Sequence, residues 1–103
     1  MHTIRYTVHP EHAARNEELV RAITDELAQV KPAGLRYSVF KLEDGVSFVH
    51  LISHDKSGHL PGRELNALRA FHAGLRERCV EPPVRTELSV IGEFGPRDDA
   101  ATV

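Results

Sequence analysis

Histidine is the residue type that stands out in this chain. Seven of the 103 residues are His, against two Tyr, one Cys and no Trp. His50 lies in a β-rich run and His72 on the apolar stripe of a predicted helix, whereas the other five fall near the chain start, in loops or at a helix entry. An imidazole in a partly apolar cleft titrates near neutrality and could remove a phenolic or enolic proton without a metal. We therefore select His50 and His72 as candidate catalytic residues.

Both histidines also have a structural interpretation. His50 could be satisfied by a hydrogen bond inside the interface of a barrel formed by two sheets, for example to Ser38 across two strands, because buried polar groups usually find partners. His72 points toward the predicted sheet and could pack at the rim of the core against Leu68 and Leu75. The sequence leaves both interpretations open.

Aromatic side chains supply the candidate substrate contacts. The two tyrosines could orient a substrate oxygen, or could be half-buried strand residues with the hydroxyl at the rim. The residues assigned to substrate binding are Tyr6, Tyr37, Phe48 and Phe71.

Metal binding is not expected. An extended chain would separate His50 from His54 by roughly 13 Å, too far for one ion with ligands near 2 Å, although a bend that includes His59 could bring them closer. We therefore predict no metal and no cofactor. Cys79 is interpreted as a small core residue, and Arg78 as part of the solvated side of its helix.

Hydrophobic periodicity places these residues on six elements. Alternation predicts a strand over 3–8, and spacings of three and four predict a helix that starts at Pro10 and ends before Pro32. Two β-rich runs, 35–42 and 46–53, flank a turn. A helix over 65–79 and a strand over 84–94 follow, and turn-rich residues 54–63 form a surface loop.

This order predicts a ferredoxin-like α+β sandwich. The βαββαβ arrangement gives a four-stranded antiparallel sheet with two helices on one face. We expect a single domain over residues 1–95 and a C-terminal tail, 96–103, that frays.

The turn between the two central runs allows two registers. If Asp44-Gly45 is a two-residue turn, Val39 opposes His50. If Glu43-Asp44 is a type I turn with a left-handed Gly45, Phe40 opposes Phe48 and Ser38 opposes His50. We favour the second because it pairs two aromatics. One parity carries Phe40, Leu42, Val46, Phe48 and Ile52, and the other carries Tyr37, Val39, Val49 and Leu51.

Both faces of the predicted sheet are therefore apolar, and helices can cover only one of them. Burial of the second face would contribute several kcal/mol at about 25 cal/mol per Å². We expect a homodimer in which two sheets pack face to face as a dimeric α/β barrel.

Composition excludes two classes of partner. A net charge of −2 and a pI near 6.4, with no basic block, argue against nucleic acid. No run approaches the roughly 18 apolar residues of a membrane span, and the start lacks the pattern of a signal peptide. With a single Cys, a reducing compartment is favoured, and we expect a cytoplasmic protein.

The chain resembles a known family in its pattern. The hairpin over 40–51 and the helical run over 67–75 look like the antibiotic biosynthesis monooxygenase group of the dimeric α/β-barrel superfamily. The resemblance implies homodimers that place ligands between sheet and helices. The superfamily includes cofactor-independent monooxygenases of polycyclic quinol-like substrates, haem-degrading enzymes, in which a His comparable to His72 binds iron, and isomerases. Because the chain has no Trp, haem degradation is not expected.

Two functions follow from the residues and the resemblance together. The first is a cofactor-independent monooxygenase-like oxidoreductase that acts on a small aromatic or polyketide-like substrate. The alternative is a non-catalytic dimeric ligand-binding or accessory protein of the same fold. A cavity reached by His50 or His72 together with a Tyr would favour the enzyme.

Overall fold

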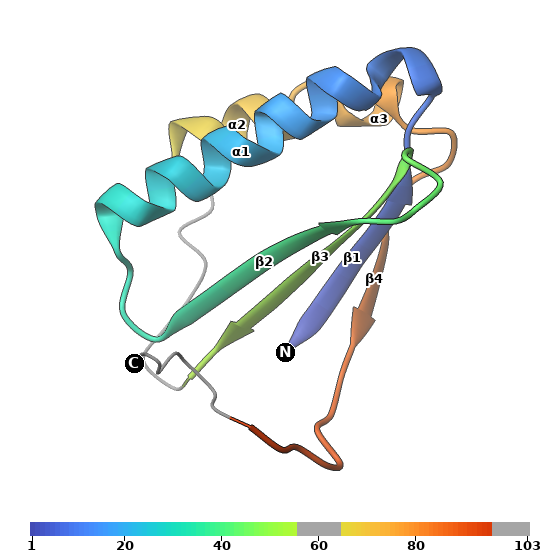
Figure 1. Cartoon of the computed structure of the whole chain (residues 1–103). Helices are drawn as coiled ribbons and strands as arrows, with labels where there is room; N and C mark the ends of the chain where they lie inside the picture. Colours follow the sequence, from blue (N-terminus) through green and yellow to red (C-terminus); the bar gives the residue numbers. More distant parts are fainter. Residues whose placement is uncertain (56–64, 96–103) are drawn as a thin grey trace.

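The computed structural model describes residues 1–55 and 65–95. Its elements, in chain order, are β1 (His2–Thr7), the 3-10 helix η1 (Pro10–His12), α1 (Ala13–Val30), β2 (Leu35–Lys41), β3 (Ser47–His54), α2 (Asn66–His72), α3 (Leu75–Arg78) and β4 (Val84–Glu87). The strands form one antiparallel sheet in the order β2-β3-β1-β4, and the helices lie together on one of its faces (Figure 1). The predicted ferredoxin-like α+β fold is confirmed.

The inner face of the sheet and the helices enclose the core. Alternation along β3 turns Phe48, His50 and Ile52 toward the helices, and all three are buried. The apolar stripe of α1 covers them, as predicted from its spacing. The buried apolar residues are Tyr6, Val8, Leu19, Val20, Ile23, Phe48, Ile52, Leu65, Leu68, Phe71 and Cys79. Within the described part of the chain, none of the helices is long and apolar enough to cross a membrane.

The second predicted helix is broken into two. It was expected to run over 65–79, but α2 ends at His72 and α3 begins at Leu75. The break falls at Gly74, whose φ of 80° is left-handed, a conformation that interrupts a right-handed helix. The prediction missed the break because a single Gly within a periodic pattern is tolerated in many helices.

The register of the β2–β3 hairpin differs from the one favoured from the sequence. Val39 lies opposite His50 and Phe40 opposite Val49. The expected pairs of Phe40 with Phe48 and of Ser38 with His50 are wrong. Val39 therefore lies on the inner face together with His50, and Phe40 lies on the outer face together with Val49.

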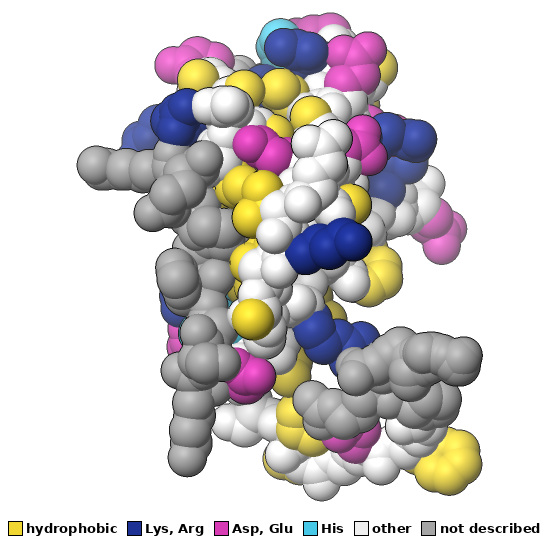
Figure 2. All heavy atoms as spheres, turned by 90° about the vertical axis from the view of Figure 1, so that its left-hand side faces the viewer, with side chains coloured by type: hydrophobic (Ala, Val, Ile, Leu, Met, Phe, Trp, Pro, Cys, Tyr) yellow, Lys and Arg dark blue, Asp and Glu magenta, His cyan; other side chains and the backbone are white. Residues whose placement is uncertain are grey.

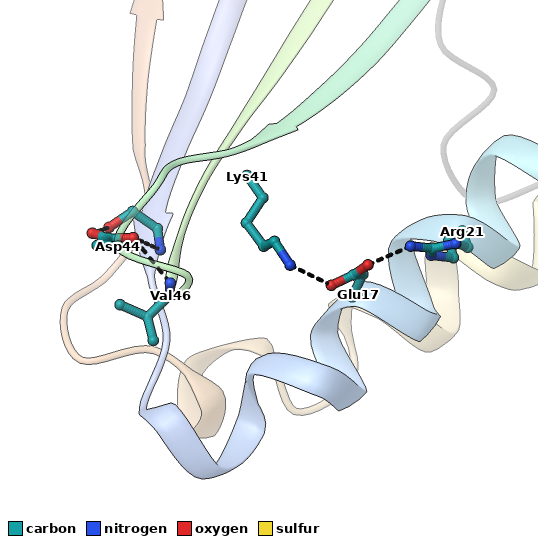
Figure 3. Close-up of polar contacts among 6 residues, drawn as sticks. Glu17, Arg21, Lys41, Asp44 and Val46 are labelled. Carbon is teal, nitrogen blue, oxygen red and sulfur yellow. Dashed lines mark hydrogen bonds and ion pairs between the residues drawn. The ribbon is translucent and has the colours of Figure 1, made fainter.

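The turn itself explains this register. The Gly45 amide donates to the Leu42 carbonyl over 3.0 Å, and Gly45 is left-handed, as the type I alternative predicted. The Asp44 carboxylate accepts hydrogen bonds from the Val46 and Ser47 amides (2.9 and 2.8 Å; Figure 3), which keeps Val46 inside the loop. Leu42 consequently pairs with Ser47, one residue later than expected.

A polar contact ties the end of β2 to α1. The Lys41 ammonium donates to a Glu17 carboxylate oxygen over 3.0 Å, and Glu17 also pairs with Arg21 one turn further along α1 (Figure 3). These two cations hold the pKa of the Glu17 carboxyl below its usual value. The contact is exposed, so it positions the two elements more than it stabilises them.

The fourth strand is shorter than predicted. Alternation suggested a strand over 84–94, but β4 ends at Glu87. Its partner β1 begins at His2, and the last ladder bond runs from the Leu88 amide to the Met1 carbonyl over 2.9 Å. None of the described residues after β4, 88–95, belongs to a strand. Four large apolar side chains consequently stay exposed after β4: Leu88, Val90, Ile91 and Phe94. The predicted tail, and most of the predicted loop over 54–63, lie outside the described residues.

Gly74 offers a test of the helix break. Gly74→Ala forces a Cβ into a left-handed conformation, so we expect the free energy of unfolding to fall by about 1–2 kcal/mol. Gly92→Ala is the matched control, because a Cβ added at Gly92 would have no atom within 4 Å and its φ lies outside the left-handed region. Urea denaturation measures both changes. Equal stability of Gly74→Ala and the parent protein would contradict the role of Gly74.

Candidate active site

His50 lies at the middle of the sheet with both ring nitrogens engaged. Its side chain is 4% exposed. The Tyr6 hydroxyl lies 2.7 Å from His50 Nε2, and the Tyr37 hydroxyl lies 2.7 Å from His50 Nδ1. The expected partner Ser38 is not used, because the observed register turns Ser38 to the outer face. The sheet therefore clamps one imidazole between two phenols.

Strand register brings these three side chains together. Tyr6 on β1 lies opposite Phe48, and Tyr37 on β2 lies opposite Ile52. Both phenols are thus diagonal neighbours of His50, one from each adjacent strand, and all three side chains share the inner face. Diagonal positions in antiparallel strands are within reach of long aromatic side chains.

The hydrogen-bonded chain continues into the helices. Asn16 on α1 donates from Nδ2 to the Tyr6 hydroxyl over 2.9 Å. Arg78 on α3 donates from Nε to Asn16 Oδ1 over 3.1 Å. Asn16 and Arg78 are both buried. Five side chains from five elements therefore form one continuous network: Tyr37, His50, Tyr6, Asn16 and Arg78.

Phe71 on α2 closes the network from the helix side. Its ring centroid lies 5.2 Å from that of His50 and 6.0 Å from that of Tyr6, and the Arg78 guanidinium carbon lies 5.2 Å from it. Arg78 also donates to the Phe71 carbonyl over 2.7 Å and to the Ala73 carbonyl over 3.2 Å. One guanidinium thus satisfies the end of α2 and holds Asn16.

Burial keeps the titratable members of the network neutral. Burial, followed by the nearby positive charge of His72, lowers the pKa of His50 to about 4. Burial also raises the pKa of the Tyr6 and Tyr37 hydroxyls well above 10. At neutral pH the cluster is an uncharged imidazole between two uncharged phenols, and its formal charge lies on Arg78.

His72 is not brought into this cluster. It ends α2 with an exposed side chain, contrary to the expected orientation toward the sheet. Its ring lies 5.6 Å from that of Phe71, which in turn contacts His50, so an aromatic ring separates the two histidines. Because α2 ends at this residue, the stripe predicted for a longer helix does not continue through it.

Two of the other residues singled out in the sequence, Phe48 and Cys79, are buried in the core. Phe48 is buried and stacks on Tyr6 with centroids 5.6 Å apart, so it belongs to the core that supports the network. Cys79 is buried, and burial raises the pKa of its thiol. Among residues 1–55 and 65–95, no group of three or more His, Cys, Asp or Glu side chains could hold a metal ion. His59 lies outside the described residues.

Sequence reasoning missed Asn16 and Arg78. Asn16 had a usable signal, because it stands in the buried stripe of α1 one turn before Leu19 and Val20, where an apolar residue is typical. Arg78 was assigned to the solvated side of its helix, and this is wrong. No sequence pattern distinguishes it from exposed Arg76, because its burial depends on the break after α2.

Two hollows lie between α1 and β2 on the side of Tyr37. The first measures about 240 Å³ and is lined by Thr24, Leu27, Ala28, Lys31, Pro32, Leu35 and Tyr37. The second, about 260 Å³, is lined by Glu17, Val20, Arg21, Thr24, Val39, Lys41 and Phe48. They share Thr24. Tyr37 is thus the member of the network that lines the first hollow, which we call the Tyr37 hollow.

A larger hollow lies on the opposite face of the sheet. It measures about 440 Å³, and the residues of β2, β3 and the segment after β4 that line it include Arg36, Leu51 and Ile91. In Figure 2, hydrophobic side chains are exposed at the lower end of the molecule, and Lys or Arg side chains lie above them. No member of the His50 network lines this larger hollow, so size alone does not identify the candidate site.

Comparison with solved structures places this architecture among known folds. A protein from Nitrosomonas europaea, whose assignment as an antibiotic biosynthesis monooxygenase is itself provisional, superposes with a TM-score of 0.68 at 14% identity over 91% of each chain. Rv0793 from Mycobacterium tuberculosis gives 0.61 at 22% identity, over 91% of this chain and 96% of that one. Another antibiotic biosynthesis monooxygenase gives 0.62 at 15% identity, over 89% of this chain and 100% of that one.

These similarities confirm the resemblance at the level of the fold. The chain has the fold of antibiotic biosynthesis monooxygenase-like proteins over about nine tenths of its length. No family model matches the sequence, and no curated protein matches it. Function must therefore be argued from the site itself.

The buried His50 predicts a pH dependence of stability. Since its pKa is about 4 in the folded protein against 6.5 for the ordinary side chain, the unfolded chain binds more protons between these values, and stability falls as the pH falls. We expect a loss of about 2 kcal/mol between roughly pH 7.5 and pH 5, measured by urea unfolding.

Site-specific titration separates His50 from the other histidines. The NMR signals of the His50 ring should titrate with a midpoint of about 4. The control is His54→Gln, at an exposed histidine, which should leave the His50 midpoint unchanged. A His50 midpoint at the ordinary value would contradict the burial argument.

Proposed function

We propose that the protein is a cofactor-independent monooxygenase-like enzyme that acts on a small aromatic or polyketide-like substrate. The observation that carries this proposal is the Tyr37–His50 pair, a phenol hydrogen-bonded over 2.7 Å to a buried neutral imidazole at the wall of a hollow. The similar fold of antibiotic biosynthesis monooxygenases supports it. The chemistry is that of a phenol or enol whose anion reacts with dioxygen directly.

The geometry assigns different tasks to the two residues. Both nitrogens of His50 are occupied and its side chain is buried, so it does not contact a substrate itself. Tyr37 is half-buried and lines the hollow, so its hydroxyl meets the substrate oxygen while His50 orients it. In the reaction, a carbon of the anion that is a CH₂ group in the neutral substrate forms a C–O bond with dioxygen. This carbon becomes a carbonyl that keeps one oxygen atom, and the other oxygen atom leaves as water.

Two observations favour the non-catalytic alternative. A cavity reached by His50 or His72 is expected of the enzyme, and neither residue lines either hollow between α1 and β2. Each nitrogen of His50 has a partner inside the protein, as in a histidine retained to satisfy a core. A ligand-binding protein would use the Tyr37 hollow without needing a proton to move. The two functions differ in whether dioxygen is consumed.

Oxygen uptake with quinol and anthrone substrates tests the enzyme. We expect Tyr37→Phe to lower kcat about 100-fold, because the substrate loses a positioned hydroxyl while the aromatic ring still packs. His54→Gln should leave the rate unchanged. Full activity of Tyr37→Phe would remove Tyr37 from the mechanism, and substrate binding without oxygen uptake by the parent protein would establish the ligand-binding alternative.

We also propose that the protein is a homodimer whose interface is the outer face of the sheet. The helices cover the inner face, and the outer face carries Phe40, 53% exposed, and Val84, 60% exposed, beside half-buried Val49 and Leu51. The segment after β4 adds fully exposed Ile91. A second copy of the chain would remove both apolar surfaces from water at once.

Sedimentation tests the dimer. The parent protein should sediment as a dimer at micromolar concentration, and Phe40→Glu should shift it to a monomer because a charge is placed in an apolar contact. Ala22→Glu, on the exposed side of α1, is the control and should remain a dimer. A monomeric parent protein would overturn the proposal.

A further inference from the structure

The hydrogen-bond network has a direction, and Arg78 sets it. A guanidinium only donates hydrogen bonds, so the Asn16 atom that faces Arg78 Nε must be the carbonyl oxygen. The amide nitrogen of Asn16 therefore faces the Tyr6 hydroxyl, to which it donates. The buried charge thus fixes the orientation of an amide that could otherwise be turned either way.

The direction passes from Asn16 through Tyr6 to His50. Among the described residues, the Tyr6 hydroxyl has two partners, Asn16 and His50. It accepts from Asn16, so its own hydrogen is left for His50 Nε2. A neutral imidazole that accepts at Nε2 carries its proton on Nδ1. That proton is donated to the Tyr37 oxygen.

Tyr37 is the last member of the hydrogen-bond network, and the hydrogen of its hydroxyl has no fixed acceptor. Within residues 1–55 and 65–95, His50 is the hydrogen-bond partner found for the Tyr37 hydroxyl. Since Tyr37 already accepts from His50, its O–H is directed away from the network. If the ligand lies beside Tyr37, as proposed above, this hydrogen is the donor that Tyr37 offers to it.

We propose that Asn16, anchored by Arg78, is a positioning residue that holds His50 in the Nδ1-protonated form and makes Tyr37 a donor, so that the site selects the anionic form of an acidic enol or phenol. The preference for an anion rests on the proposed location of the ligand beside Tyr37. The protonated position on His50 does not depend on it.

The charges around the hollow agree with an anionic ligand. Its described lining includes one cation, Lys31, and no carboxylate. The direction of the network also argues against proton removal by this site. To take a proton from a substrate, Tyr37 would have to pass its own to His50 Nδ1, which already carries one. A ligand that is already ionised needs no such transfer, and its oxygen accepts from Tyr37.

Nitrogen-15 NMR of the His50 ring tests the direction without any ligand. We expect the parent protein to be protonated on Nδ1 at neutral pH. In Asn16→Asp, the carboxylate still accepts from Arg78 but also accepts the hydrogen of the Tyr6 hydroxyl. The direction of every later hydrogen bond in the network then reverses, and His50 should carry its proton on Nε2. Asn66→Asp makes the same chemical change at an exposed position and should leave His50 unchanged.

Each result bears on the direction. A proton on Nε2 in the parent protein overturns it, and this measurement needs no variant that might fail to fold. A proton on Nδ1 in both the parent protein and Asn16→Asp shows that Asn16 does not position His50. A proton on Nε2 in Asn16→Asp, with a proton on Nδ1 in both the parent protein and Asn66→Asp, supports the proposal.

A coloured probe tests the preference for an anion separately. 2-Hydroxy-1,4-naphthoquinone is an enol that is ionised at neutral pH, and its methyl ether is neutral with nearly the same shape. We expect the enol to bind about tenfold more tightly, and Tyr37→Phe to abolish this difference. Equal affinities would overturn the anion preference while leaving the His50 result intact. Binding of neither probe would remove the ligand site on which the proposed function also depends.

Discussion

The buried guanidinium of Arg78 is the interaction on which the site depends. A buried charge is costly unless its donors are satisfied, and Arg78 satisfies three of them, on Asn16 and on the carbonyls of Phe71 and Ala73. The same side chain therefore terminates α2, places Phe71 over the inner face of the sheet and orients Asn16. Without that orientation, the hydrogen bonds through Tyr6 and His50 would have no reason to point one way. Arg78 thus links the helix break at Gly74 to the candidate site.

The absence of charge on His50 and the hydrogen bonds at both of its nitrogens together define what the cluster can do. His50 is an imidazole whose burial keeps it uncharged and whose two nitrogens each have a phenolic partner. Such a group is poorly suited to act on a substrate directly, but it can hold Tyr37 in one orientation at the wall of the Tyr37 hollow. Preorganised donors of this kind stabilise negative charge on oxygen more effectively than mobile water does. In the proposed function, the cluster would therefore bind and polarise a substrate oxygen and would not exchange protons through histidine.

The sheet separates two tasks between its faces. Its inner face carries the network and the core, whereas its outer face carries Phe40 and Val84 in exposed positions and borders the larger hollow. β4 ends at Glu87, which pairs with His2 of β1, and the apolar side chains of the segment after it are exposed in the single chain. Both features agree with the proposed homodimer, and neither involves a contact with His50. Association and the proposed chemistry can therefore be changed by mutation independently of each other.

The sequence by itself determined the order of the elements and the apolar character of both sheet faces, because periods of two and of three to four residues distinguish the two sides of a strand or helix. It did not decide which face of the sheet carries His50. It also identified Tyr6 and Tyr37 as the phenols of the site. The hairpin register, the break at Gly74 and the burial of Arg78 were decided only by the tertiary structure. The burial of Arg78 depends on its contact with Asn16, which is distant in the chain. The hairpin register depends on the Asp44 hydrogen bonds that keep Val46 in the loop, and the Val46 carbonyl accepts from the distant Val8 amide. Local pattern carries no information about such partners, so the sequence supplied the imidazole and the phenols while the fold alone supplied the charge that orients them.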